Sequence, residues 1–307
     1  MTTGIPTSDA SRTPDALVAR LFEANLGMFD VMAVYLGDRL GLYRALDDGE
    51  PATSGELASR AGIDERYARE WLEQQAVTGL LDVDDAAGAA DRRYTLPGAY
   101  RDALLDPDSP YSISPLGRSL VACAKVMPLL LEAYRTGGGV EWAAYGPDMI
   151  EAQGDFNRPW LVNSFGTEIL PAIPSIQERL TADPPARVAD VACGVGWAGI
   201  AIALAYPNVR VDGFDLDESS IELARASARR LGVADRVSFQ VADGASIGEA
   251  GAFDLAVIIE SVHDMARPVD VLAAVRRLLR PGGTLLIADE KTEDHFTPGR
   301  SLSLIHI

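Results

Sequence analysis

The chain has 307 residues, 48% of them hydrophobic, and a formal net charge of −18 at pH 7. This length is enough for two modest domains with a sizeable core. The negative charge disfavours a general nucleic-acid binder, which needs basic surface for phosphates, and it disfavours binding to anionic membranes. The two cysteines, Cys123 and Cys193, lie far apart without metal-ligand spacing, so we expect a cytoplasmic protein and no metal site.

The first segment of the chain changes from polar to strongly apolar. Residues 1–14 are polar, lack the apolar core of a signal peptide, and are expected to form a disordered tail. From Asp15 to Leu46, apolar side chains recur on more than one face of a predicted helix. Because a helix that is apolar nearly all round is normally buried, we expect this one to be buried against a second copy of the chain. The pattern predicts a homodimer, with an ordinary intramolecular core as the alternative.

Residues 15–96 are predicted to form a winged-helix domain. A capping box from Thr53 to Glu56 opens a short helix, and Asp64 can cap the helix that follows. Two short strands around a Gly/Ala/Asp loop are then predicted between residues 80 and 96. Two helices followed by a two-stranded wing is the winged-helix arrangement.

A winged helix often binds DNA, and the charge of this domain bears on that reading. Residues 15–102 contain 17 Asp and Glu but only 9 Arg. Phosphate contacts require the opposite balance. We therefore interpret the domain as a dimerisation module and substrate lid. A DNA-binding regulator is kept as an alternative.

The next region, residues 97–180, is expected to be mainly helical. Prolines and the glycine run at 137–139 interrupt it. The segment from Tyr145 to Trp160 mixes aromatic and polar side chains, which is typical of a pocket wall and also of a surface loop. We expect a helical connector that forms one wall of a substrate pocket.

Residues 181–301 are predicted to form an α/β domain, because apolar strand-like runs alternate with helical segments. Strands separated by helices imply a parallel sheet with helices on both faces, and ligands bind at the carboxyl ends of such strands. The predicted strands are Val188–Cys193, Val209–Phe214, Val237–Val241, Leu255–Glu260 and Thr284–Ala288.

The first of these strands runs into a glycine-rich motif. The run from Gly194 to Gly199 reads GVGWAG and satisfies the pattern G-x-G-x-x-G. Its glycines permit a tight turn and a close approach of ligand to backbone, and the following helix offers unpaired N–H groups. Asp215 lies about 20 residues further on, a spacing that suits a carboxylate binding ribose hydroxyls. Taken alone, this combination fits an NAD-dependent oxidoreductase equally well.

Further residues at the strand ends narrow the choice of ligand. Asp243 closes the third strand, where its carboxylate can accept a hydrogen bond from an adenine amino group. The run from Glu260 to Asp264 places ionisable groups after the fourth strand, and Pro281 begins a P-G-G turn into the fifth. We expect Asp190, which lies inside the first strand, to brace the glycine loop by hydrogen bonds.

Together these motifs carry a resemblance to a known family. The order is D-x-x-C-G-x-G from Asp190, G-F-D ending at Asp215, A-D-G around Asp243 and P-G-G from Pro281. Over residues 187 to about 290 it resembles the class I S-adenosylmethionine-dependent methyltransferases. The whole chain is similar to an actinobacterial group of two-domain methyltransferases and, more distantly, to small-molecule O-methyltransferases. The resemblance implies a Rossmann-like sheet behind a winged helix, S-adenosylmethionine as cofactor and a small-molecule methyl acceptor.

The resemblance also assigns the cofactor-binding residues. It implies that the glycine loop lies along the methionine part of the cofactor, that Asp215 takes the ribose hydroxyls, and that Asp243 meets the adenine. The family usually has glycine where Ala192 stands, so a methyl group there should narrow the loop. The implied cofactor-binding residues are Asp190, Ala192, Gly194, Gly196, Trp197, Asp215, Leu216, Asp243, Gly244 and Glu260.

For the catalytic residues, the resemblance points to His263. In the O-methyltransferases a histidine followed by an acidic or amide residue deprotonates the acceptor hydroxyl, and His263 and Asp264 occupy the matching place. A histidine titrates near neutral pH and can act as a general base. Asp289 matches a carboxylate that orients this histidine. The residues after Asp264 lack the tryptophan and second acid of the family motif, and the alternative role of His263 is packing of the loop.

These patterns predict methyl transfer from S-adenosylmethionine to an oxygen, with nitrogen and carbon as less favoured acceptors. The alternatives are an NAD-dependent oxidoreductase and a S-adenosylmethionine-sensing winged-helix regulator. The family's sheet has about seven strands and only five are found here, so we expect that the natural chain continues and that this sheet is incomplete. Residues 302–307 continue no pattern and resemble a translated sequencing adapter, so we exclude them from the fold.

Overall fold

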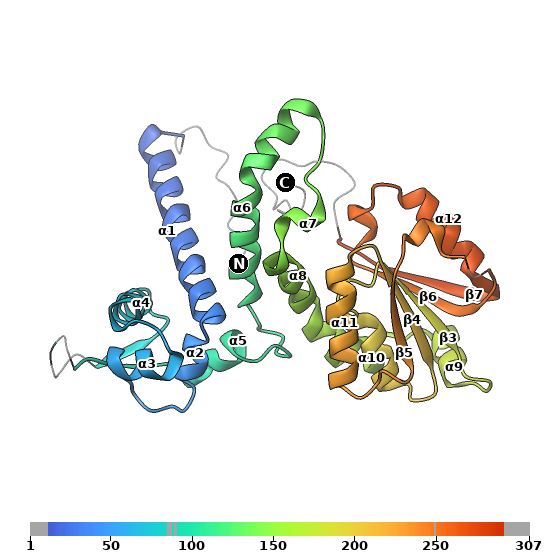
Figure 1. Ribbon diagram of the computed structural model, residues 1–307, viewed down its shortest axis with the longest axis horizontal. Helices are drawn as coiled ribbons and strands as arrows, with labels where there is room; N and C mark the ends of the chain where they lie inside the picture. Colours follow the sequence, from blue (N-terminus) through green and yellow to red (C-terminus); the bar gives the residue numbers. More distant parts are fainter. Residues whose placement is uncertain (1–11, 85–87, 89–90, 249, 292–307) are drawn as a thin grey trace.

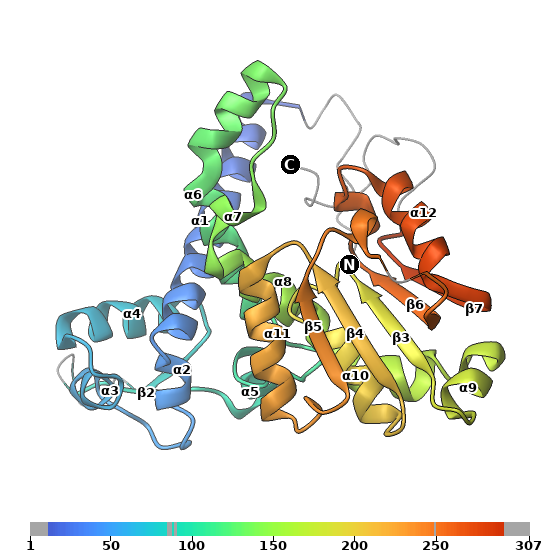
Figure 2. The same cartoon turned by 45° about the vertical axis from the view of Figure 1, so that its right-hand side comes forward.

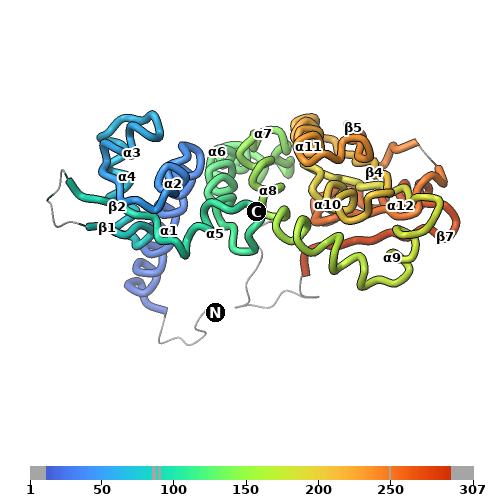
Figure 3. The backbone as a smooth tube through the Cα atoms, turned by 90° about the horizontal axis from the view of Figure 1, so that it is seen from below, coloured from blue at the N-terminus to red at the C-terminus, as the bar shows by residue number. Residues whose placement is uncertain are grey.

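The computed structural model describes residues 12–84, 88, 91–248 and 250–291. The expectations for residues 1–11 and for 302–307 lie outside the described residues. Within them, the N-terminal helices and the parallel sheet occupy opposite sides of the molecule, and α6, α7 and α8 lie between (Figure 1). Viewed from below, the same three helices again separate the two parts (Figure 3). No helix in the described ranges is long and apolar enough to cross a membrane.

The predicted helix from Asp15 to Leu46 is wrong as a single element. The structure divides it into α1 (Pro14–Arg39) and α2 (Leu42–Ala45). Gly41 separates them with a φ of 67°, a left-handed conformation that ends the first helix at no steric cost because glycine has no Cβ. Most of α1 is exposed in the single chain, with Ala33 and Gly37 as its buried residues. Ala33 belongs to the apolar core of the N-terminal domain, so the C-terminal half of α1 packs within the chain, and burial of the rest against a second copy stays a prediction.

The next elements form the predicted winged helix. They are α3 (Ser54–Ala61), α4 (Glu65–Val77), β1 (Asp82–Asp84) and β2 (Arg93–Thr95), the last two paired antiparallel. The capping box is present, because the Thr53 hydroxyl accepts from the Glu56 N–H at 3.2 Å and the Glu56 carboxylate accepts from the Thr53 N–H at 2.8 Å. Trp71 of α4 packs edge-on against Tyr43, with ring centroids 5.1 Å apart, and anchors the core of this domain.

The middle of the chain is helical, as predicted. Its elements are η2 (Gly98–Tyr100), α5 (Arg101–Leu104), α6 (Pro115–Thr136), α7 (Trp142–Tyr145), α8 (Pro147–Trp160), the π-helical η3 (Leu161–Ile169) and α9 (Pro174–Thr181). Helix α6 approaches α1 closely, since a Cβ on Gly117 would lie 2.9 Å from the backbone nitrogen of Tyr35. The buried Arg118 of α6 pairs with Asp38 of α1 at 3.0 Å and with Asp155 of α8 at 2.8 Å. These ion pairs join the three helices.

The C-terminal part is the predicted parallel sheet. Its strands are β3 (Arg187–Val191), β4 (Arg210–Asp215), β5 (Val237–Val241), β6 (Phe253–Ile259) and β7 (Leu279–Ala288), in the order β5-β4-β3-β6-β7. The helices that connect them are α10 (Trp197–Ala205), α11 (Glu218–Arg230), α12 (Pro268–Leu278) and the short η4 (Gly244–Ser246) and η5 (Val262–Asp264). Separate apolar clusters bury α10 with α11 and, on the other face, α12 (Figure 2).

The order of the strands places a ligand crevice beside β3. The chain moves outward from β3 to β4 and β5, then returns to place β6 on the other side of β3. In open parallel sheets a crevice forms at the carboxyl ends of the strands where the order reverses in this way.

The last strand differs from its prediction at its start. The structure begins β7 at Leu279, whereas the sequence pattern predicts a turn up to Thr284. The pairing with β6 jumps from Leu279 to Thr284 across an irregularity, and Gly282 within it has a φ of 81°. The P-G-G motif is therefore a bulge-like interruption inside the paired strand.

Candidate active site

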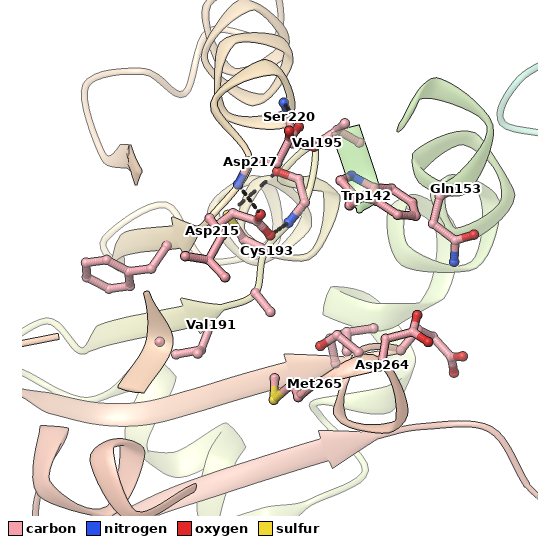
Figure 4. Close-up of a pocket in the computed structure, with 18 of the residues that line it drawn as sticks. Trp142, Gln153, Val191, Cys193, Val195, Asp215, Asp217, Ser220, Asp264 and Met265 are labelled. Carbon is pink, nitrogen blue, oxygen red and sulfur yellow. Dashed lines mark hydrogen bonds between the residues drawn. The ribbon is translucent and has the colours of Figure 1, made fainter. Parts of the chain in front are cut away.

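A cavity of about 630 Å³ opens at the carboxyl ends of β3, β4 and β6. One wall is the glycine-rich loop after β3, and the facing wall comes from α7 and α8, which contribute Trp142 and Gln153 (Figure 4). Asp264 and Met265, which follow β6, close the lower side in the same view. Cavities of about this size typically bind small molecules and cofactors.

The glycine loop has an unusual backbone. Three of its residues adopt positive φ, with values of 56° at Ala192, 51° at Gly194 and 82° at Gly196. At Ala192 this costs about 1–2 kcal/mol, because a Cβ in the left-handed region crowds the carbonyl oxygen. That cost explains physically why glycine suits this position. At Gly196 an added Cβ would lie 2.5 Å from the ring of Phe239, so only glycine fits there.

Asp190 lies under this loop and is 1% exposed. Its Oδ2 accepts a hydrogen bond from the Gly199 N–H at 2.9 Å, which fixes the first turn of α10. Burial raises the pKa of this carboxyl to about 7, although the Gly199 N–H favours the charged form. The helix begins at Trp197, so Gly199 lies inside it and not in the turn. Asp190 therefore holds the helix that follows the glycine loop, and its expected bracing of the loop itself stays a prediction.

Asp215 joins the glycine loop to the end of β4. Its Oδ2 accepts from the Gly194 N–H at 2.7 Å and its Oδ1 accepts from the Asp217 N–H at 2.9 Å (Figure 4). Burial raises the pKa of Asp215. Because a carboxylate oxygen has two lone pairs, both oxygens can still accept hydrogen bonds from a ligand in the cavity. The neighbouring Leu216 is 69% exposed at the cavity mouth.

Asp243 and Gly244 form the far end of the cavity. The Oδ1 of Asp243 caps η4 by accepting from the Ala245 N–H at 2.9 Å, and its Oδ2 accepts from Arg267 at 2.9 Å. A Cβ on Gly244 would lie 3.1 Å from the side chain of Val191, so the chain is tightly packed at this point.

Trp197 begins α10 and is 5% exposed. The guanidinium of Arg158 lies 4.4 Å from the centre of its ring, and the same guanidinium forms a two-point ion pair with Asp108. The ring of Trp197 therefore links the end of α8 to α10, the helix that follows the glycine loop. Although Trp197 lines the cavity, its ring packs in the core of the sheet domain.

The predicted catalytic residues cluster at η5 and the end of β7. The Nδ1 of His263 contacts the Asp289 carboxylate, and its Nε2 lies 3.4 Å from an oxygen of Asp264. Asp289 also accepts from the Val262 N–H at 3.0 Å, which orients it. Burial lowers the pKa of His263, but the hydrogen bond with Asp289 and the charge of Asp264 outweigh it and leave the pKa raised.

The cavity itself is bordered by the neighbours of this histidine. Glu260, Ser261 and Asp264 line it, whereas His263 does not. Glu260 has a φ of 49°, a strained value for a side chain of this size, and such strain often marks functional sites. Burial raises the pKa of Glu260, and the nearby carboxylates of Asp289 and Glu290 add to that shift.

Several cavity residues were missed by the sequence patterns. Glu141 and Trp142 precede the segment identified as a pocket wall, while Gln153 and Asn157 lie within it without a distinct signal. Gln153 and Asn157 are four residues apart on α8, which places them on one helix face. A Cβ on Gly154 would lie 2.1 Å from the Val195 side chain, so this face of α8 lies directly on the glycine loop.

Comparisons with known proteins agree with this geometry. Residues 182–303 match a family model described as a methyltransferase domain, and residues 27–105 match one described as an Rv2258c-like winged HTH domain. The chain therefore contains a methyltransferase domain behind a winged helix-turn-helix domain. The Rossmann-like sheet and the winged helix predicted from the sequence are confirmed.

Two curated relatives are methyltransferases. The methyltransferase GfsG of Streptomyces halstedii is 37% identical over 115 residues, which are 37% of this chain and 41% of that protein. The 27-O-demethylrifamycin SV methyltransferase of Amycolatopsis mediterranei is 36% identical over 104 residues, or 34% of this chain and 38% of its own length. The matched part of the chain thus spans less than half the length of these relatives.

Solved structures extend the likeness to nearly the whole chain. The mitomycin 7-O-methyltransferase MmcR superposes with a TM-score of 0.65 and 20% identity, covering 95% of this chain and 84% of that one. Human N-acetylserotonin methyltransferase, solved in complex with SAM, gives a TM-score of 0.64 and 19% identity, covering 90% and 80%. At these identities the likeness concerns the fold, including the arrangement of the helical region beside the sheet.

Proposed function

We propose that this chain transfers the methyl group of S-adenosylmethionine to an oxygen of a small molecule. The observation that carries the proposal is one cavity that joins a left-handed glycine loop to carboxylates at two successive strand ends, Asp215 and Asp243. This arrangement lies in the region that matches the methyltransferase domain model. Two of the proteins named above, the 27-O-demethylrifamycin SV methyltransferase and the mitomycin 7-O-methyltransferase, are named for methyl transfer to an oxygen of a small molecule.

The residues present fit the proposed cofactor. When bound, S-adenosylmethionine supplies a methyl group carried on a positively charged sulfonium. Asp215 and Asp243 would accept hydrogen bonds from the ribose and the adenine, and the backbone of the glycine loop would accommodate the methionine part. Further carboxylates, Glu260 and Asp264, border the cavity and complement a cationic ligand. The volume of about 630 Å³ has room for a ligand of this size.

The acceptor hydroxyl must lose a proton to a base, and we assign that role to His263, which does not itself line the cavity but stands in the chain between the lining residues Ser261 and Asp264. Asp289 accepts the Nδ1–H and holds the ring, so that Nε2 can take the proton. Asp264, 3.4 Å from Nε2, stabilises the imidazolium that results. The alternative is that His263 only holds the end of β6 against Asp289.

His263→Ala separates these two roles. We expect methyl transfer to slow about 10²–10⁴-fold while the affinity for S-adenosylhomocysteine stays the same. Because the pKa of His263 is raised, the base form is lost as pH falls, so the rate of the unmodified protein should rise with pH through a value above 6.5. Full turnover in the variant would leave only the packing role. A single-turnover assay on the unmodified protein and the variant measures the rate of methyl transfer and its dependence on pH.

The cofactor assignment is tested by calorimetric titration. S-adenosylhomocysteine should bind the chain and NADH should not, because the carboxylates that line the cavity repel the pyrophosphate of NADH. Binding of NADH alone would contradict the proposal and favour an oxidoreductase.

A DNA-binding regulator that senses S-adenosylmethionine is a second candidate, because residues 27–105 match a winged HTH model. The exposed surface of α4 and its cap carries Asp64, Glu65 and Glu70 against Arg66 and Arg69. Arg69 is itself paired with Glu65 at 3.7 Å. We therefore favour a structural role for this domain, and a gel-shift assay at low salt should show no retardation of duplex DNA.

We also propose that the chain forms a homodimer through α1. Along this helix runs a row of side chains that are about half exposed or more, namely Leu17, Val18, Leu21, Phe22, Leu26 and Phe29. Contiguous apolar surface of this kind is costly in water and marks interaction sites. A second copy offers the same surface and so covers it symmetrically.

Both cysteines are free thiols, which supports a reducing, cytoplasmic setting.

A further inference from the structure

The far end of the cavity carries an ion pair that the proposed chemistry does not use. Arg267 and Asp243 both line the cavity, and the Arg267 Nη2 lies 2.9 Å from the Asp243 Oδ2. Resting on the proposed function, we propose that Arg267 is a specificity residue, which together with Asp243 distinguishes adenine from other purine bases in the cofactor.

Both carboxylate oxygens of Asp243 already accept hydrogen bonds from the protein. Its Oδ1 accepts from the Ala245 N–H at 2.9 Å and thereby starts η4. Each oxygen keeps one lone pair for a ligand, and the Oδ2 lies beside the guanidinium of Arg267, from which it already accepts a hydrogen bond. A base that reaches Asp243 therefore meets an acceptor and a donor side by side, and not an isolated carboxylate.

The second step is the pattern that this pair recognises. Adenine presents an amino donor next to a ring-nitrogen acceptor. Oδ2 of Asp243 can accept from the amino group, while an N–H of Arg267 donates to the ring nitrogen, so each group meets its complement. A deaminated purine presents a carbonyl acceptor next to a ring N–H, which reverses the pattern. Because Asp215 holds the ribose, the base cannot shift along the edge to restore the match.

The third step is how the chain places Arg267. The residue immediately precedes α12, whose first position is Pro268. Proline restricts the backbone of the residue before it to non-helical conformations, and Arg267 has a φ of −136° and a ψ of 63°. A second carboxylate, that of Asp270, lies 3.9 Å from the Nη1 of Arg267.

Because the ion pair between Arg267 and Asp243 is partly exposed, its effect on ligand affinity can be measured apart from its effect on stability. The Arg267 side chain is 62% exposed and that of Asp243 is 31% exposed. Exposed ion pairs contribute little to stability because solvent screens them. Removing the guanidinium should therefore change ligand affinity without a matching change in melting temperature.

The test compares two nucleosides on two variants. S-adenosylhomocysteine and its deaminated analogue S-inosylhomocysteine are titrated calorimetrically into the unmodified protein, Arg267→Met and the control Arg276→Met. Arg276 is exposed on the same helix and does not line the cavity. Melting temperatures of all three proteins are recorded in parallel.

We expect the unmodified protein to bind S-adenosylhomocysteine about tenfold or more tightly than the analogue, as one charge-assisted hydrogen bond implies. Arg267→Met should lose roughly tenfold in affinity for the adenine compound and most of the preference between the two, whereas Arg276→Met should keep both. Unchanged or tighter binding by Arg267→Met, or equal losses for both compounds, would overturn the inference. Failure of the unmodified protein to bind either compound would instead contradict the proposed function.

Discussion

Two apolar helices of this molecule, α10 and α1, have opposite surroundings. Helix α10 buries seven of its nine residues, from Trp197 to Ala203, between the sheet and η3. Helix α1 has 26 residues and buries two of them, although leucine and phenylalanine side chains recur along it. The chain itself therefore covers α10 along most of its length, whereas it buries α1 only toward the C-terminal end, at Ala33 and Gly37.

We expect the largest difference between the two helices in the stability lost when one side chain in each is truncated to alanine. Ile200 of α10 is fully buried, and Ile200→Ala should lower the free energy of unfolding by about 3 kcal/mol through lost contacts and a cavity. Leu21 of α1 is 53% exposed, so Leu21→Ala should cost below about 0.5 kcal/mol in dilute protein. Urea titrations at two protein concentrations measure both values. A cost for Leu21→Ala equal to that of Ile200→Ala would end the distinction between the helices.

Adding a charge to α1 tests what covers it. Leu21→Glu should raise the dimer dissociation constant by roughly 100-fold or more, because a carboxylate would be buried without a partner in the symmetric interface. Sedimentation velocity across a concentration series measures the shift. Glu23→Ala, a change of a polar and exposed side chain on the same helix, is the control. A monomeric unmodified protein at all concentrations would contradict the proposed dimer.

The two helices also differ in how a carboxylate beside each of them should affect the dependence of stability on pH. Asp190 beneath α10 has a pKa raised to about 7, above its unfolded value near 3.9, so the folded state binds the proton more tightly than the unfolded state. Stability should therefore fall as pH rises from about 4 to 7, by on the order of 3 kcal/mol from this group. Asp190→Asn should remove that part of the slope. Asp15→Asn, at an exposed position of α1, should leave it in place.

The smallest expected effects come from two helical glycines. Gly154 of α8 faces the glycine loop, and an added methyl would press into Val195, so Gly154→Ala should weaken S-adenosylhomocysteine binding by roughly tenfold. Gly27 of α1 has no atom of the described residues within 4 Å of an added Cβ. Gly27→Ala should therefore stabilise the helix by about 0.5–1 kcal/mol without changing affinity. Calorimetry and thermal melts distinguish the two, and equal affinities would show that α8 does not press on the loop.

Local rules explain what the sequence predicted well. The capping box at Thr53 and the cap at Asp64 act within four residues, so their helices are found where expected. Strand β5 (Val237–Val241) has the predicted bounds because its alternating apolar and polar residues are followed directly by the A-D-G turn around Asp243. The Rossmann-like sheet follows from repetition of such local signals.

The features that were missed depend on contacts between distant residues. Trp142 faces the cavity only because α6 and α8 place α7 opposite the glycine loop, and no pattern around it indicates that. The pairing of Arg267 with Asp243 joins residues 24 positions apart through the fold of β6 and α12. The break at Gly41 is a local signal, but the apolar run on both sides obscures it.

The buried Arg118 makes a mechanical unit of helices that the sequence separates by more than 100 residues. It ties α6 to Asp38 of α1 and to Asp155 of α8, and breaking such pairs would leave buried charge uncompensated at a cost of about 3–5 kcal/mol. The wall that carries Gln153 is therefore attached rigidly to the helix that we expect at the dimer interface. A change in the width of the cavity on this side would therefore have to move α1, α6 and α8 together relative to the sheet.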